Sequence, residues 1–244
     1  AAEMALINND CERSFATGIA GFSHVVDSLS AIKYAKVKII RDEEGITKDF
    51  EIEGDFPRYG NDDPRADELA TWLLRTFFDK IRRRHTYRDS KPSTSILTIT
   101  SNVVYGEATG ATPDGRYAHT PVADGVSPSA GKDVNGPTAA ATSVSRLDHF
   151  IVSNGTLFNQ KFHPSALAGR EGLEKFVALI RTFFDQKGMH MQFNVVDRET
   201  LLDAQKHPEK YAHLVVRVAG YSALFTTLSK SLQDDIIRRT EQGF

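Results

Sequence analysis

The amino-acid sequence predicts an α/β fold whose strands pair mainly in parallel. Apolar residues recur at helical spacing in several segments, and short segments rich in β-branched residues lie between them. This alternation of helices and strands is typical of βαβ units. With 244 residues, of which 40% are hydrophobic and 25% charged, the chain has the composition of a globular protein with one large domain or two small ones.

The first part of the chain contains two predicted helices. Within residues 13–38, the apolar positions have helical spacing, and residues 50–53 alternate as a short strand does. Asp63 followed by Pro64 is a helix start, because an acidic N-cap precedes proline at the first helical position. The predicted apolar face of this helix comprises Leu69, Trp72, Leu73, Phe77 and Ile81. Basic residues 82–85 suit a solvated helix end more than a phosphate site.

The middle of the chain combines a compact strand with a long polar segment. Residues 95–100 are apolar and β-branched, which predicts a buried strand. Residues 105–146 are rich in Gly, Pro, Ser, Thr, Asp and Asn, and predict either a disordered linker or a well-packed irregular segment. Another amphipathic helix follows Gly169 and stops at Gly188. Its predicted apolar face comprises Leu173, Phe176, Val177, Ile180 and Phe183.

The last part of the chain alternates strands and helices. We expect strands at 191–196 and 214–218. Between them we expect a short helix that Asp197 caps and that runs through Ala204. A final helix begins at Ser229.

Gly220 lies where the second of these strands would otherwise continue. Glycine weakens a strand, so two interpretations stay open: a turn or bulge glycine, or a position at which chemistry requires the absence of a Cβ. A radical on a glycine Cα is such a case, because a planar Cα delocalises the electron into the amide on one side and the carbonyl on the other. Val216, Val218 and Tyr221 are then candidates to shield it from oxygen and water.

Charge and composition exclude several classes of protein. The net charge of −2 and pI of about 6.5 give no basic excess for nucleic acid or an anionic membrane. No apolar run approaches the ~20 residues of a membrane span, and the N-terminus lacks the features of a signal peptide. One cysteine, Cys11, excludes an intramolecular disulfide and fits a reducing cytoplasm. Because the sequence does not begin with Met, we expect a piece of a longer protein.

Other candidate sites carry less information. The sequence has no phosphate loop, dinucleotide-binding fingerprint or His-Glu-x-x-His motif, and the spacing around His207 and His213 predicts no metal site. Arg116 follows a Pro-Asp-Gly turn and is either part of that turn or a clamp for a carboxylate. Cys11 lies near Arg13 and is either a reactive thiol or, more commonly, a structural cysteine.

The residues around Gly220 resemble the C-terminal domain of the glycyl radical enzymes. Arg-Val-Ala-Gly-Tyr at 217–221 is followed by Leu228-Ser229 and by the residues 235–240, as in that family. The resemblance covers essentially the whole chain and implies the C-terminal portion of a ten-stranded α/β barrel. It implies a pyruvate formate-lyase-like barrel part at 1–120 and a glycine radical domain at 121–244, with Gly220 as the residue that carries the radical.

Different stretches resemble two branches of this family. The stretches similar to pyruvate formate-lyase are Asp27–Lys38, Ile40–Gly45, Phe50–Gly54 and Leu97–Gly106. The stretches similar to the dehydratase and C–N lyase branch, which includes glycerol dehydratase and choline trimethylamine-lyase, are Ala123–Pro128, Asn135–Ala139, Ser153–Leu157 and Asn159–Phe162. Ala219 and Ser222, beside the glycine motif, also resemble the second branch.

The resemblance implies a mechanism that this chain cannot complete by itself. In the family, the glycyl radical generates a thiyl radical on a cysteine, which attacks the substrate; in pyruvate formate-lyase, acetyl then passes to coenzyme A. This sequence has neither a Cys-Cys pair nor a Gly-Cys-x-Glu motif. The resemblance therefore implies a cysteine-bearing N-terminal half outside this chain, without which the chain is inactive and its sheet edges favour association. It also implies an S-adenosylmethionine-dependent activating enzyme and a homodimeric full-length form.

Three functions stay open. The first is the radical-bearing part of a formate C-acetyltransferase, which the stretches within 27–106 favour. The second is the same part of a radical dehydratase or C–N lyase, which the stretches within 121–222 favour. The third is a non-enzymatic protein that replaces the radical domain of a damaged enzyme, in which residues 1–150 would have no role. In the first two, residues 205–244 must separate from the rest to reach the activating enzyme.

Overall fold

The computed structural model describes residues 2–4, 6–7 and 11–244 of the chain. Residues 1, 5 and 8–10 lie outside this description, and they include part of the N-terminus that lacks the features of a signal peptide and the residues just before Cys11. Among the described residues, no helix is both long and apolar enough to cross a membrane.

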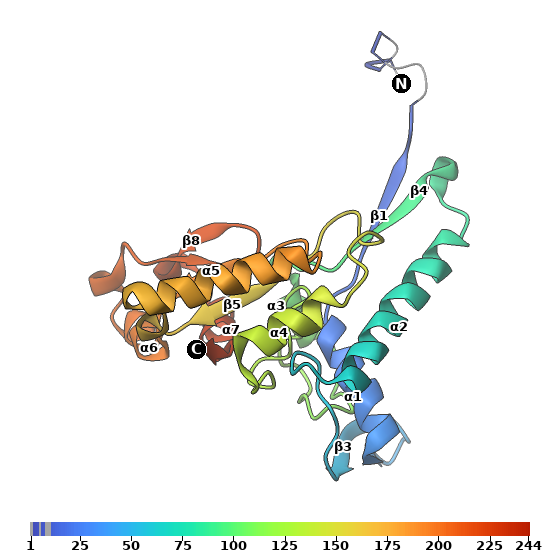
Figure 1. The fold of residues 1–244 in the computed structure, drawn as a ribbon. Coiled ribbons are helices and arrows are strands. Elements are labelled where there is room, and N and C mark those ends of the chain that lie inside the picture. Colours follow the sequence, from blue (N-terminus) through green and yellow to red (C-terminus); the bar gives the residue numbers. More distant parts are fainter. Residues whose placement is uncertain (1, 5, 8–10) are drawn as a thin grey trace.

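The N-terminal part is built from two strand pairs and two long helices. Its elements are β1 (Ser14–Gly18), α1 (Phe22–Tyr34), β2 (Lys36–Arg41), β3 (Thr47–Glu53), α2 (Pro64–Arg82), the 3₁₀ turn η1 (Tyr87–Asp89), β4 (Lys91–Ser95) and α3 (Ser101–Glu107). β1 pairs with β4 in parallel, and β2 pairs with β3 as an antiparallel hairpin. Figure 1 shows the first pair on the arm that leads to the N-terminus and the second pair beyond α1.

The C-terminal part centres on a small parallel sheet. Its elements are α4 (Gly136–Ser145), β5 (Asn159–Phe162), η2 (Pro164–Leu167), α5 (Gly169–Asp185), β6 (Gln192–Val195), α6 (Arg198–Lys206), η3 (Pro208–Tyr211), β7 (Val215–Arg217), β8 (Ser222–Leu224), η4 (Phe225–Thr227), α7 (Lys230–Arg238) and β9 (Glu241–Gln242). β5 lies between β6 and β9 and is parallel to both, while β7 and β8 form an antiparallel hairpin. In Figure 1, α5 runs along β5.

Two separate hydrophobic cores hold the described residues together. The larger core joins α1, α2, α4, α5 and β5, with Phe22, Leu74 and Phe158 among its fully buried side chains. The smaller core is formed entirely by residues between 196 and 237, from α6, the β7–β8 hairpin and α7. The hairpin therefore has its own apolar support, which is distinct from that of the main body.

The predicted helix starts are confirmed by their caps. The Asp63 carboxylate accepts a hydrogen bond from the Arg65 amide at 3.0 Å, directly before Pro64 begins α2. Asp197 accepts from the Thr200 amide at 2.6 Å and begins α6, and Ser229 accepts from the Leu232 amide at 3.4 Å and begins α7. The predicted strands near 191–196 and 214–218 are also present as β6 and β7.

Several predicted elements differ in the structure. The buried strand expected at 95–100 is wrong: β4 ends at Ser95, Ile96 forms a single bridge to Thr156, and Ile99 has a φ of +53° in a turn. Pairing stops there because β1, the partner of β4, ends at Gly18. Segment 13–38 is not wholly helical, since it begins with β1 and ends within β2.

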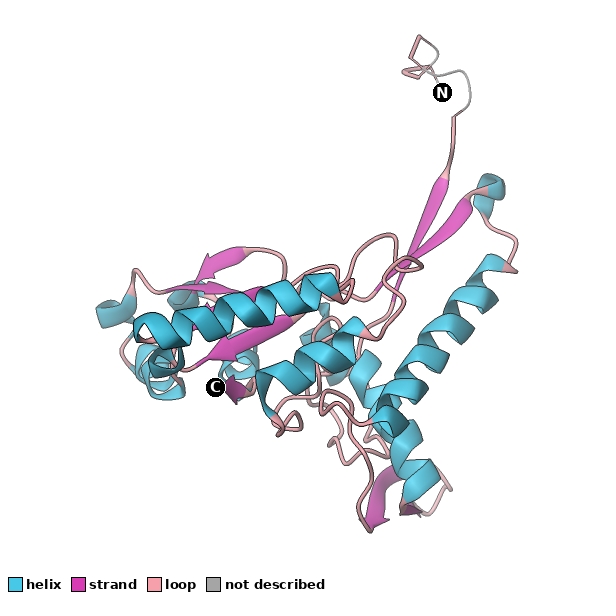
Figure 2. Ribbon diagram, viewed as in Figure 1, coloured by secondary structure: helices cyan, strands magenta, loops and turns pink. Residues whose placement is uncertain are grey.

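The long polar segment is a well-packed part of the molecule. Residues 122–129 are all buried, and the segment contains the end of α3 and all of α4, which the composition did not predict. Figure 2 shows that most of the chain between these two helices is loop. Arg116 explains part of this order, because its guanidinium donates to the carbonyls of Thr109, Gly110, Tyr117 and Thr120.

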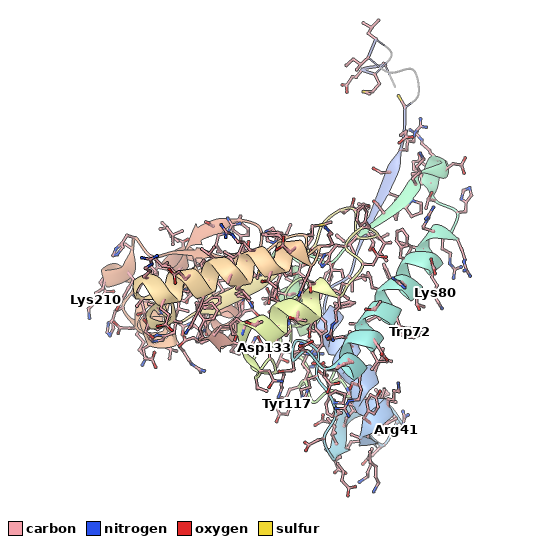
Figure 3. All side chains as sticks on the ribbon, viewed as in Figure 1. Arg41, Trp72, Lys80, Tyr117, Asp133 and Lys210 are labelled. Atoms are coloured by element: carbon pink, nitrogen blue, oxygen red, sulfur yellow. The ribbon has the colours of Figure 1, made fainter. Side chains whose placement is uncertain are left out.

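The helix faces and the strand pairing are also corrected by the structure. Trp72 is 56% exposed and lies on the outer side of α2 (Figure 3), while Ala66, Ala70 and Leu74 form the buried stripe. α5 likewise exposes Leu173 and buries Phe183. The predicted faces are right in part: Leu69 and Leu73 of α2, and Phe176 and Phe183 of α5, pack in or against the larger core. Trp72 and Leu173 do not, because each helix retains apolar residues on its exposed side. The pairing is only partly parallel, since β2–β3 and β7–β8 are antiparallel sheets.

Candidate functional site

Gly220 lies at the tip of the β7–β8 hairpin. The Val218 amide donates to the Tyr221 carbonyl at 2.9 Å, and Ala219 and Gly220 connect the two strands. Gly220 has a φ of +79°, in the left-handed region that glycine adopts freely and that the third position of a type II turn requires. A Cβ on Gly220 would lie 3.4 Å from Leu157 Cδ1, an ordinary contact. Backbone conformation, and not lack of space, therefore requires glycine here.

The side chains expected to shield Gly220 do not cover it. Val216 and Val218 are 1% and 0% exposed and point into the smaller core, whereas Gly220 is exposed and Tyr221 is 38% exposed. The left-handed backbone and the held amide of Gly220 fit a residue that stores a radical on its Cα. Among the described residues, Val216 and Val218 therefore do not provide the shield that the sequence predicted.

Two side chains of β6 bind the backbone of the hairpin. Asn194 Oδ1 accepts from the Arg217 amide at 2.8 Å, and Asn194 Nδ2 donates to the Arg217 carbonyl at 2.8 Å. Gln192 Oε1 accepts from the Gly220 amide at 3.1 Å and from Arg217 Nη2 at 3.0 Å. The hairpin is thus attached to the edge of the main sheet through side-chain amides in place of a strand ladder.

A buried cluster of charged groups holds the other side of the hairpin. Arg239 Nη1 donates to the Val218 carbonyl at 2.8 Å, and its Nη2 donates to Asp235 at 3.3 Å. Asp124 lies 3.9 Å from Arg239 Nε and accepts a hydrogen bond from Asn159. Burial disfavours the charged form of Arg239, but the carboxylates of Asp124 and Asp235 outweigh that effect and raise the Arg239 pKa. This arginine therefore remains charged although only 9% of its surface is exposed.

The C-terminal tail is tied to the main body by a buried carboxylate. Asp133, labelled in Figure 3, accepts hydrogen bonds from Thr240 and from Gln242 Nε2, the second at 2.6 Å. Burial raises the pKa of Asp133 to about 6, although the two hydrogen bonds act in the opposite direction. On β5, the buried Lys161 donates to the Ile237 carbonyl at 3.0 Å, and burial lowers the pKa of this lysine.

The other candidates from the sequence are not brought to Gly220. Arg116 binds backbone carbonyls and is committed to the loop around it, which contradicts a role as a carboxylate clamp. His207 lies beside Asp203 and Glu209 at the end of α6, at 3.7 and 3.9 Å. In the described part of the chain, no group of three or more His, Cys, Asp or Glu side chains is placed to hold a metal ion.

Sequence reasoning missed the residues that hold the hairpin. Asn159, Gln192 and Asn194 lie on short strands, and Arg239 lies just beyond α7. The available signal was a run of polar residues at 159–161 between the apolar residues Phe158 and Phe162, since amides that become buried need hydrogen-bond partners.

Comparison with known proteins decides the family. The chain matches the description "Pyruvate formate lyase-like" over residues 1–106 and "Glycine radical" over residues 122–226, and the second range contains Gly220. The chain belongs to the glycyl radical enzyme family. It therefore has the fold of part of the ten-stranded α/β barrel of these enzymes, with a glycine radical domain.

Individual glycyl radical enzymes are similar over most of this chain. Formate acetyltransferase 1 of Escherichia coli K12 is 48% identical over 97% of this chain and 32% of its own length. The glycerol-bound B12-independent glycerol dehydratase of Clostridium butyricum superimposes with a TM-score of 0.81, at 46% identity over 95% of this chain and 31% of that chain. A Roseburia inulinivorans structure described for 1,2-propanediol dehydration gives 0.73, at 61% identity over 77% of this chain and 22% of that chain. This chain thus spans about a third of the length of the curated relatives that it matches.

Proposed function

We propose that this chain is the radical-bearing part of a formate C-acetyltransferase, which converts pyruvate and coenzyme A to acetyl-CoA and formate, and that Gly220 stores the radical. The observation that carries the proposal is the hairpin tip itself. A glycine in a left-handed turn, with its amide bound, lies inside the glycine radical match. The 48% identity to formate acetyltransferase 1 over 97% of the chain supports this reaction.

The radical supplies one-electron chemistry: loss of one hydrogen atom from Cα leaves an unpaired electron that the neighbouring amide and carbonyl share. The residues of this chain hold Gly220 and the hairpin around it in place. Gln192 fixes the Gly220 amide, Asn194 fixes the preceding backbone, and Arg239 fixes the Val218 carbonyl. The proposed boundary between the barrel part and the glycine radical domain lies near residue 120.

The proposed reaction also requires two partners that this chain does not contain. A cysteine-bearing N-terminal half would complete the barrel, cover Gly220 and receive coenzyme A as co-substrate, so the 244-residue chain alone is inactive. An S-adenosylmethionine-dependent activating enzyme installs the radical, the complete enzyme is a homodimer, and it works in the cytoplasm. The separate smaller core, formed by residues between 196 and 237, supports the proposal that residues 205–244 separate from the rest to meet the activating enzyme.

A dehydratase function is the second candidate, because a specific observation favours it. The structure described for 1,2-propanediol dehydration is 61% identical over 77% of this chain, a higher identity over a shorter stretch than that of the formate acetyltransferase. To separate the two, the chain is combined with an N-terminal half of each kind, one with the Cys-Cys pair and one with Gly-Cys-x-Glu. Formation of acetyl-CoA from pyruvate supports the first function, and loss of water from a diol supports the second.

The radical site is tested by the mass of the chain. The chain is activated without oxygen by a radical-activating enzyme, S-adenosylmethionine and a reductant, and is then exposed to air. Because oxygen cuts a glycyl radical backbone at its own residue, a new C-terminal piece that begins near Tyr221 is expected. Gly220→Ala is the matched control and must stay intact. An uncut wild-type chain, with an activating enzyme that works on a control protein, overturns the assignment of Gly220.

A further inference from the structure

The amide of Gly220 is one end of a hydrogen-bond chain that finishes at a carboxylate. Gly220 N–H donates to Gln192 Oε1 at 3.1 Å, Gln192 Nε2 donates to Asn159 Oδ1, and Asn159 Nδ2 donates to Asp124 Oδ2. Every donor in this series of hydrogen bonds points away from the glycine and toward the carboxylate. Gln192, Asn159 and Asp124 are 5%, 9% and 6% exposed, so bulk water does not compete for these bonds.

An aligned chain of this kind is stronger than its separate links. Hydrogen bonds that point the same way polarise one another, and a charged acceptor strengthens the bond that it receives. The negative charge of Asp124 therefore makes Gln192 Oε1 a better acceptor, although two side chains lie between Asp124 and the glycine. Arg217 Nη2 also donates to Gln192 Oε1, at 3.0 Å, which fixes the orientation of the Gln192 amide.

We infer that Gln192, Asn159 and Asp124 are positioning residues that draw the Gly220 N–H toward the carboxylate and increase electron density at the Gly220 nitrogen. That nitrogen is bonded to the Cα on which the proposed radical resides, and an electron-rich amide nitrogen takes a larger share of the unpaired electron. The inference rests on the proposed role of Gly220 and assigns to this network the tuning of that residue.

Asn194, on the same strand as Gln192, is a matched control for the alternative that the network only anchors the hairpin mechanically. Asn194 is also on β6, is 6% exposed, and holds the hairpin through hydrogen bonds to the Arg217 backbone, whereas Gln192 binds the Gly220 amide. If the network only anchors the hairpin, loss of Asn194 and loss of Gln192 must affect Gly220 alike. If it polarises the Gly220 amide, Gln192 and the distant Asp124 must matter in a way that Asn194 does not.

The first test uses the unactivated 244-residue chain labelled with ¹⁵N and ¹³C and needs no radical. A scalar coupling across the hydrogen bond between Gly220 N and Gln192 Cδ is expected in the wild type, which requires no variant to fold. The Gly220 amide proton resonance is expected to move upfield in Gln192→Met and, by a smaller amount, in Asp124→Asn, and to stay in place in Asn194→Leu. Absence of the coupling overturns the inference, and so does an Asp124→Asn shift no larger than that of Asn194→Leu.

The second test measures the radical in the chain activated without oxygen. With [¹⁵N]glycine labelling, the ¹⁵N hyperfine coupling of the electron paramagnetic resonance signal reports spin density on the Gly220 nitrogen. Gln192→Met is expected to reduce this coupling and to shorten the half-life of the radical about five-fold, the effect of losing one ordinary hydrogen bond. Asn194→Leu is expected to leave the coupling unchanged. A wild-type chain without a glycyl signal refutes the proposed function, whereas a signal with equal coupling in all variants refutes this inference.

Discussion

Asn194 binds the peptide units on both sides of the Arg217 Cα, accepting from its amide and donating to its carbonyl at 2.8 Å each. A side-chain amide matches the donor and acceptor of a backbone strand, and it therefore substitutes for the ladder that β6 and β7 do not form. Because Asn194 accepts one of these hydrogen bonds and donates the other, its amide cannot be replaced by a group that only accepts.

Asn194→Asp tests this polarity. At pH 8 the carboxylate accepts from the Arg217 amide but repels the Arg217 carbonyl, and we expect a loss of about 1–3 kcal/mol in the free energy of unfolding. At pH 4, where the new acid takes up a proton and donates again, most of the loss is expected to disappear. Urea titrations of both proteins at both pH values measure this; a deficit that is independent of pH contradicts the proposed polarity.

Gly125 is required by a close approach of two backbone segments. A Cβ there would lie 2.2 Å from the Leu157 carbonyl oxygen, whereas a Cβ on Gly131 would meet nothing within 4 Å. Both glycines have positive φ values, +51° and +75°, so Gly131→Ala is a control for backbone strain. We expect Gly131→Ala to cost about 1–2 kcal/mol and Gly125→Ala to cost clearly more, as measured by denaturant unfolding. Equal costs would mean that residues around Leu157 move aside freely.

The buried Arg239 is expected to be a major source of stability for the hairpin. Arg239→Met leaves the carboxylates of Asp124 and Asp235 buried without their cation, and the expected loss is about 3–5 kcal/mol. The double variant Asp235→Asn/Arg239→Met removes one of those carboxylates and is expected to recover part of the loss. Thermal unfolding of the single and double variants measures this, and a double variant less stable than Arg239→Met contradicts it.

Asp27 makes the stability of the main body depend on pH. It is fully buried, its Oδ1 accepts from the Tyr59 amide at 2.8 Å, and its Oδ2 has no hydrogen-bond partner in the described part of the chain. Burial raises its pKa from 3.8 to about 7. Because the folded-state pKa is the higher one, the protonated group stabilises the fold below about pH 4, and that contribution is lost as the pH rises to about 7.

Asp27→Asn removes this dependence. At pH 8 the variant is expected to be more stable than the wild type, by on the order of 4 kcal/mol at most, since a shift of one pKa unit corresponds to about 1.4 kcal/mol. Below pH 4 the two proteins are expected to have similar stability. Unfolding titrations between pH 4 and 8 measure the difference, and curves that run parallel throughout this range contradict the raised pKa.

The exposure of Trp72 gives a simple test of how α2 packs. We expect Trp72→Gln to change the free energy of unfolding by less than about 0.5 kcal/mol, because the side chain is 56% exposed. Leu74→Ala, two residues later in the buried stripe, is expected to cost about 2–5 kcal/mol. If the two costs are reversed, the side of α2 that carries Trp72 packs, and the side that carries Leu74 does not.

Local chemistry made the helix starts predictable, while tertiary contacts decided what the sequence could not show. Asp63, Asp197 and Ser229 cap their helices with their own side chains, so the signal lies within three residues. β5 went unnoticed because three of its four residues are polar, and each is buried only because a distant partner binds it. These partners include Gln192 for Asn159 and the Ile237 carbonyl for Lys161.

The candidate site also contains one residue that the sequence indicated and several that only the folded structure shows. Gly220 could be proposed from its neighbours in the sequence, since a glycine is unusual at a position where a strand would otherwise continue. Asn159, Gln192 and Arg239 could not, because they come from separate elements and meet the hairpin only after folding. Shielding by Val216 and Val218 was expected wrongly, because alternation along the strand turns both toward the smaller core.

The smaller core determines what happens to the chain if it is cut at the hairpin tip. Residues 221–244 contribute Phe225, Ile236 and Ile237 to that core, and residues before the cut contribute Leu201 and Val216. Since this burial does not depend on the peptide bond at the tip, the two fragments are expected to stay associated and to elute together at the size of the intact protein. Cleavage would become visible only after the chain is denatured, so a native gel or a size-exclusion profile would report a nicked protein as whole.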